Sequence, residues 1–140
     1  MKKVAIILLI ALACIMLCSC AEEITTNIGG TACEIQKYSL EKEIAGITPE
    51  NSGNMLLRVD IQTSNSSDPD KLSDVFFGDV KSNAQTGSNL YECKAIAFSE
   101  DEDGLIAIPI YEVPAINEKT EYTITGQGFD PFTFTVDPKK

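Results

Sequence analysis

The stretch Met55-Leu56-Leu57-Arg58-Val59-Asp60-Ile61-Gln62-Thr63 decides the fold class of this chain. Apolar and polar side chains alternate through most of it, and a period of two residues is typical of a β-strand with one buried face. Turn-forming residues flank it at 51–54 and 64–70. We therefore predict a strand over 55–63 that directs Leu57, Val59 and Ile61 toward a core.

Short strands are also predicted on both sides of this stretch. They are expected at Cys33–Leu40, Tyr91–Phe98, Leu105–Val113, Tyr122–Thr125 and Phe132–Val136. The segment Leu105–Val113 is apolar at both parities, so it should be buried on both sides or switch sheets. Asp68 followed by Pro69 is a helix-start signal and indicates a short helical turn near residues 69–77. The pattern as a whole predicts an all-β, two-sheet antiparallel β-sandwich of about seven strands.

The N-terminus has the layout of a secretory signal. Lys2 and Lys3 precede an uncharged apolar run from Val4 to Leu17, and that run is shorter than the roughly 20 residues needed to cross a bilayer. An uncleaved anchor helix is the alternative. The run Leu17-Cys18-Ser19-Cys20 then resembles the lipobox of bacterial lipoproteins. The resemblance implies cleavage after residue 19 and attachment of a diacylglyceryl group to Cys20.

The expected organisation follows from this reading. Residues 1–19 are a cleaved signal peptide, residues 20–30 are the lipidated Cys and a polar tether, and residues 31–138 form one sandwich domain. The tether would reach at most about 35 Å when extended, so the domain is expected close to a membrane in the cell envelope. It would be held by the lipid at the outer face of the cytoplasmic membrane, or at an outer membrane where one exists.

The cysteine count is consistent with export. Five cysteines are present, of which cleavage removes two and the lipid uses Cys20. Cys33 and Cys93 remain, and an even remainder in an oxidising compartment predicts a disulfide between them. Two buried free thiols are the alternative.

Composition limits the functions that this chain can have. The formal net charge is −10, and it becomes −12 once the two lysines of the signal are removed. Such a charge opposes binding to nucleic acid. The chain contains no His, which excludes nucleophiles activated by His and the commonest transition-metal ligand.

A family resemblance adds to this interpretation. Leu57–Ser67 (LRVDIQTSNSS) resembles the strand and N-x-S turn of the telokin-like, immunoglobulin-like domains of bacterial lipoproteins. Ile108–Pro114 is similar to their late strand with its Pro corner, and Tyr122–Ile124 to their closing strand. The match covers roughly residues 54 to 126, and the acidic run before Gly104 departs from the family pattern. It implies an immunoglobulin-like sandwich and no particular chemistry.

Three functions remain as hypotheses. The first is a non-catalytic binding module for an extracellular protein or envelope component, without a cofactor other than the covalent lipid. The second is a carboxylate-based hydrolase of envelope glycans, which requires two acids about 5 to 9.5 Å apart in a cleft. The third is a calcium-dependent structural or adhesive module. In the run Ser99–Gly104, Ser99, Asp101 and Asp103 occupy the first, third and fifth positions of a calcium loop, although position 12 would be Ile110.

Overall fold

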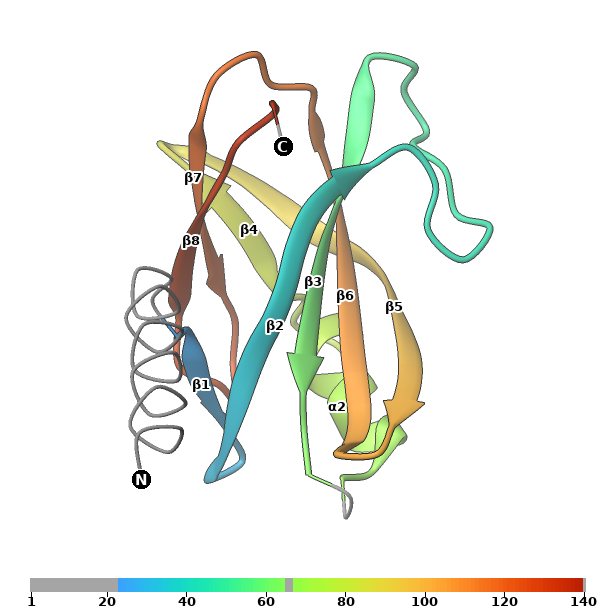
Figure 1. The fold of residues 1–140 in the computed structure, drawn as a ribbon, viewed down its shortest axis with the longest axis vertical. Coiled ribbons are helices and arrows are strands. Elements are labelled where there is room, and N and C mark those ends of the chain that lie inside the picture. Colours follow the sequence, from blue (N-terminus) through green and yellow to red (C-terminus); the bar gives the residue numbers. More distant parts are fainter. Residues whose placement is uncertain (1–22, 65–66, 140) are drawn as a thin grey trace, which may run out of the picture.

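The computed structural model of the protein describes residues 23–64 and 67–139. The described strands are β1 (Thr25–Ile28), β2 (Thr31–Glu41), β3 (Asn54–Gln62), β4 (Asn83–Thr86), β5 (Asn89–Asp101), β6 (Gly104–Pro114), β7 (Thr120–Thr125) and β8 (Phe132–Val136). The one described helix is α2 (Pro69–Phe77). All paired strands are antiparallel, and the sheet order is β1-β2-β3-β6-β5-β4-β7-β8 (Figure 1).

The sheet curves until its two ends meet, so that the fold is nearly a barrel. Ile28 at the end of β1 forms a β-bridge with Phe129, just before β8. The amide of Asp130 donates to the carbonyl of Asn27 at 3.2 Å, and the Thr26 hydroxyl donates to the carbonyl of Asp130 at 2.7 Å. The first and last strands are thus joined at one end of the barrel.

The all-β class predicted from the sequence is confirmed, and so is the short helix over residues 69–77. The two-sheet, immunoglobulin-like arrangement is not confirmed. The reason lies in β5, which pairs with β4 through residues 89–92 and with β6 through residues 93–101. One long strand therefore carries the hydrogen bonding from one half of the molecule to the other, and all eight strands belong to one sheet.

The expected tether is partly wrong, because Thr25–Ile28 is strand β1 rather than free chain. Gly29 and Gly30 both have positive φ, at 57° and 87°. A two-residue turn of that conformation matches the twist of an antiparallel pair and returns the chain as β2. The domain therefore begins before residue 31, and the hairpin signal in the sequence was the Gly-Gly pair between two β-prone runs.

The strand over 55–63 was predicted correctly, and it lies at the centre of the packing. Leu57, Val59 and Ile61 of β3 are fully buried in the main core, as their alternation predicts. On the opposite face, Leu56 joins a second apolar cluster with Ile108 and Ile110 of β6. The strand β6 is thus buried on both sides, which was one of the two outcomes expected from its apolar run.

The β2–β3 connection covers this second cluster. Its residues Ile44 and Ile47 exchange two backbone hydrogen bonds and pack near Leu56. The carboxylate of Glu112 accepts from the amide of Glu50 at 2.7 Å and from Nζ of Lys94 at 2.8 Å. Lys94 Nζ also donates to the carbonyl of Thr48 at 3.3 Å, so side chains of β6 and β5 together hold the connection against the outer face of the sheet.

Candidate functional site

The two ends of the sheet, β1–β2 and β8, meet along a line that we call the seam. The strands are hydrogen-bonded across the seam at one end of the barrel and unpaired at the other. β1 pairs with β2 only as far as Glu34, with one further hydrogen bond from the amide of Ile35 to the carbonyl of Ile24. Beyond that point, within the described residues, Lys37–Glu41 pairs with β3 alone and Phe132–Val136 pairs with β7 alone. Two free strand edges therefore border the same open seam, in which the ring of Tyr38 stacks on Phe134 with centroids 4.5 Å apart.

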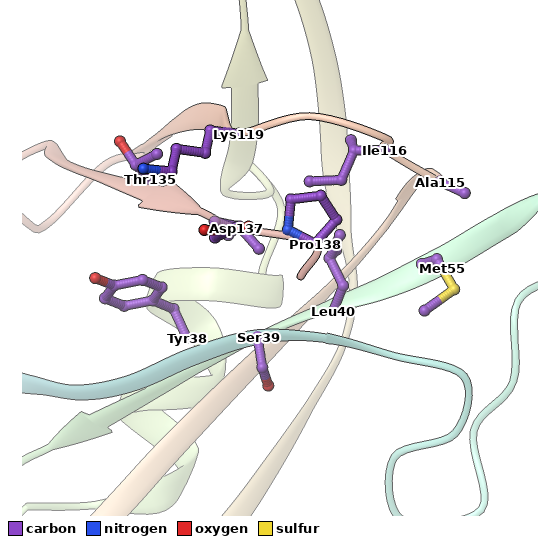
Figure 2. A pocket seen from close by; sticks show the side chains of 11 residues that line it. Tyr38, Ser39, Leu40, Met55, Ala115, Ile116, Lys119, Thr135, Asp137 and Pro138 are labelled. Atoms are coloured by element: carbon purple, nitrogen blue, oxygen red, sulfur yellow. The ribbon is translucent and has the colours of Figure 1, made fainter. Parts of the chain in front are cut away.

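A cavity of about 580 Å³ lies at the open end of the seam. It is lined by Tyr38, Ser39, Leu40, Met55, Ala115, Ile116, Lys119, Thr135, Val136, Asp137 and Pro138. Figure 2 shows Leu40 and Ile116 approaching Pro138 from opposite sides, with Met55 further along the same wall. The volume lies within the range of about 300–1,000 Å³ that is usual for ligand sites.

The cavity has an apolar wall and few charges. Among the described residues that line it, only Lys119 and Asp137 are charged. Lys119 is exposed and forms no ion pair among the described residues, whereas Asp137 accepts the amide of Lys139 at 2.9 Å. In Figure 2 the Lys119 side chain lies beside Thr135. The arrangement suits an apolar group with a negatively charged end better than a reaction that requires an acid and a base.

The chain matches no family model, no curated protein and no solved structure. A function must therefore be inferred from the geometry of the chain itself. No helix in the described part of the chain is long and apolar enough to cross a membrane. The predicted signal peptide of residues 1–19 and the predicted lipid attachment at Cys20 lie outside the described residues.

The predicted Cys33–Cys93 disulfide is absent, because the structure has both residues as buried free thiols. Glu34, the residue after Cys33, pairs with Gln62 of β3. Cys93 pairs with Tyr111 of β6, which in turn pairs with Leu57 of β3. Five residues along a strand span about 17 Å, and a disulfide requires Cα atoms within about 7 Å. The strand register therefore keeps the two thiols apart. Burial raises the pKa of the Cys93 thiol to about 11 and also raises the pKa of Cys33.

The calcium interpretation of Ser99, Asp101 and Asp103 gains no support from the structure. Asp101 ends β5, and its Oδ1 accepts the amides of Asp103 at 2.9 Å and Gly104 at 3.1 Å. The carboxylate thus stabilises the β5–β6 turn. Within residues 23–64 and 67–139, no group of three or more His, Cys, Asp or Glu side chains is arranged to hold a metal ion.

The glycan-hydrolase hypothesis needs two carboxylates that face each other in a concavity. Asp137 is the only acidic residue among the described residues that line the seam cavity, so these residues do not provide the pair. Outside the cavity, the pKa of Glu112 is lowered to about 2 by Lys94 and by hydrogen bonds from Asn54 and the Glu50 amide. A carboxylate held in that state is a poor proton donor at neutral pH.

Sequence reasoning did not identify the residues of the cavity. Leu40 belongs to a predicted strand, but Ile116, Lys119 and Pro138 lie in segments without a regular pattern. About 100 residues separate β2 from the chain that follows β8. No local motif signals that these segments meet, because their contact depends on the closure of the sheet.

Proposed function

We propose that this protein is a membrane-anchored lipoprotein outside the cytoplasm that acts as a non-catalytic binding module. The observation that carries the proposal is the seam cavity, with its apolar wall formed by Leu40, Met55 and Ile116. Lys119 is the one cation among the described lining residues, and Asp137 is the one anion. Its ligand is an apolar group with an anionic end, carried by an extracellular protein or an envelope component. No step of bond making or breaking is needed for this role.

Sequence features support the location. Lys2 and Lys3, the apolar run after them and the lipobox-like Leu17-Cys18-Ser19-Cys20 have the order required for export and lipidation. A single acyl chain gives only marginal membrane binding, so two or more chains on Cys20 make a durable anchor. Fractionation of the host cell tests this part: Cys20→Ser should move the protein from the membrane to the soluble or secreted fraction. Continued membrane retention of the variant would contradict the anchor.

A kinship with telokin-like, immunoglobulin-like domains is a further part of the proposal. It is supported by the antiparallel pairing of β3 with β6, the two segments whose sequences resemble the family. Amide hydrogen exchange tests the kinship at residues 92–94, where β5 passes from its pairing with β4 to its pairing with β6. Fast exchange confined to these residues would favour two separable sheets, and protection equal to that of the rest of β5 would count against the kinship.

Binding in the cavity can be tested with anilinonaphthalene sulfonate, an apolar probe with one negative charge. We expect saturable fluorescence with the wild-type protein and its loss in Ile116→Trp, because the indole fills the cavity. Leu90→Trp is the matched control, since Leu90 is 59% exposed on β5 and does not line the cavity. Lys119→Ala should weaken binding several-fold through loss of the cation.

The result that would overturn the proposal is equal probe binding in Ile116→Trp and in Leu90→Trp. Melting temperatures of all variants must be measured alongside, because partly unfolded proteins also bind this probe. The natural ligand is then sought by cross-linking in cells. The informative partners are those captured by wild type and Leu90→Trp and lost in Ile116→Trp.

A further inference from the structure

The residues that line the seam cavity differ from one side of it to the other. In Figure 2, Lys119 and Thr135 lie on one side of the cavity, and Met55 lies on the opposite side. The apolar side chains between these two sides are aliphatic and belong to Leu40, Ile116 and Pro138. The cavity therefore has a cation at one side, a thioether at the other and an aliphatic wall between them.

The cavity also extends across three neighbouring strands. Thr135 belongs to β8, Leu40 to β2 and Met55 to β3. The strand β2 pairs with β3, and its Tyr38 stacks on Phe134 of β8. Adjacent strands lie about 4.8 Å apart, so a ligand that contacts both Thr135 and Met55 covers roughly 10 Å. An extended chain meets this requirement better than a compact group.

The cation at one side of the cavity is free to bind an anion. Lys119 is exposed and forms no ion pair among the described residues. Asp137 also lines the cavity, but its carboxylate accepts the amide of Lys139 at 2.9 Å and does not pair with Lys119. An anionic head group beside Lys119 and the hydroxyl of Thr135 gains charge-assisted hydrogen bonds.

The wall suits an alkyl chain better than an aromatic ring. Among the described lining residues, the one aromatic side chain is Tyr38, and one face of its ring is already stacked on Phe134. Leu40 and Ile116 present aliphatic surfaces instead. Met55 is half-buried, and an unbranched thioether adapts its shape to irregular apolar space. Such a side chain can contact the end of an alkyl chain.

We propose that the ligand of the seam cavity is a single unbranched alkyl chain with an anionic head group, as in a fatty carboxylate. The head group lies at Lys119 and Thr135. The tail runs along Leu40 and Ile116 and ends at Met55, which therefore determines the length of chain that is accepted. This inference deepens the proposed function and rests on it, because both use the same cavity.

Displacement of anilinonaphthalene sulfonate by sodium alkanoates tests the chain length. Octanoate, decanoate, dodecanoate and tetradecanoate are titrated below the concentrations at which they form micelles. Affinity should rise about fourfold with each buried methylene until the tail reaches Met55, and then level off. Met55→Ala should move this limit to longer chains, and Met55→Phe should move it to shorter ones. Leu90→Ala is the matched control, because Leu90 is exposed and does not line the cavity.

The head group is tested at Lys119, whose exposure lets it be changed without loss of the fold. The wild-type protein should bind dodecanoate several-fold more tightly than dodecyltrimethylammonium, and Lys119→Glu should reverse this preference. Asp137→Asn should tighten dodecanoate binding, because it removes a negative charge and keeps the oxygen that accepts the Lys139 amide. Dodecyl phosphate is titrated alongside dodecanoate. Both fit the inference, and the tighter one distinguishes a lipid phosphate from a free fatty acid as the source.

Three results would overturn the inference. They are alkanoates that fail to displace the probe, a chain-length limit that both Met55 variants leave unchanged, and tighter binding of naphthoate than of undecanoate, which has the same number of carbon atoms. The last result would assign the cavity to an aromatic acid. A probe that binds the wild type, is lost in Ile116→Trp and is not displaced by alkanoates would remove this inference and leave the proposed function in place.

Discussion

The hydroxyl oxygens of Ser82 and Tyr111 lie 2.7 Å apart in the interior, and both residues are completely buried. Ser82 Oγ also donates to the carbonyl of Thr125 at 2.9 Å. A hydroxyl has one proton to donate, so Tyr111 must be the donor to Ser82. This chain of hydrogen bonds joins β6 to the end of β7 through the segment that follows α2. Burial raises the pKa of Tyr111 well above its ordinary value, so the phenol keeps its proton.

Removing either hydroxyl should therefore destabilise the fold. Ser82→Ala leaves the Tyr111 hydroxyl and the Thr125 carbonyl without their hydrogen bond to Ser82. We expect a loss of about 1–3 kcal/mol in the free energy of unfolding. Tyr111→Phe removes one donor and should cost about 1–2 kcal/mol. Urea denaturation of both single variants and the double variant measures the coupling. Additive losses in the double variant would show that the two hydroxyls are not coupled.

Glu112 should make the stability depend on pH in the acid range. Its pKa falls from the ordinary 4.5 to about 2 in the folded protein, chiefly through the hydrogen bond from Lys94. The unfolded chain then binds more protons between these values. The stabilisation is complete above about pH 4.5 and is lost as pH falls toward 2.

Glu112→Gln should remove this component of the pH dependence and cost roughly 2 kcal/mol at neutral pH, the size of a charge-assisted hydrogen bond. The measurement is the free energy of unfolding from pH 2 to 7. Glu34→Gln, at an exposed position on β2, controls for the loss of one negative charge. An unaltered acid profile in Glu112→Gln would contradict the assignment.

Cys33 and Cys93 should react as free thiols, but only after unfolding. Both are buried, and burial raises the pKa of each thiol, that of Cys93 to about 11. Because the thiolate is the reactive form, iodoacetamide at neutral pH should leave both unmodified in the folded Cys20→Ser protein produced from residue 20 onward, in which they are the two remaining cysteines. Denaturant without reductant should then expose two reactive thiols. Mass spectrometry counts the adducts, and zero adducts in denaturant without reductant would instead demonstrate a bridge.

The Asp101 carboxylate should contribute to stability independently of calcium. It accepts two amides of the β5–β6 turn, so Asp101→Ala is expected to lower the free energy of unfolding by about 1 kcal/mol. The loss should be the same in millimolar calcium and in chelator, as followed by thermal denaturation. Asp103→Ala is the control, because its side chain accepts no turn amide in the structure. A calcium-dependent rise in melting temperature that Asp101→Ala abolishes would restore the calcium hypothesis.

Local patterns predicted several elements correctly, and the reason is physical. Successive side chains of a strand point to opposite faces of the sheet, so apolar and polar residues alternate in β3 and β8. Leu57, Val59 and Phe134 could therefore be placed in the core. The start of α2 was signalled by Asp68, whose carboxylate accepts the amide of Asp70 at 2.9 Å. Such signals lie within a few residues of the feature they predict.

Other features depend on which segments meet, and periodicity carries no information about a strand's neighbour. The amino-acid pattern showed that β6 is apolar on both faces. Only the tertiary structure revealed that the β2–β3 connection covers the outer face and that β5 joins both halves of the sheet.

The same distinction applies to the site. The export and lipobox pattern is local, so a role for Cys20 could be predicted from the sequence, and it stays a prediction. The cavity between Leu40 and Pro138 forms because β1 is short and closes one end of the seam, leaving the other end open. Likewise, the distance between Cys33 and Cys93 follows from strand register, which the burial pattern sets across the whole sheet and not within either strand.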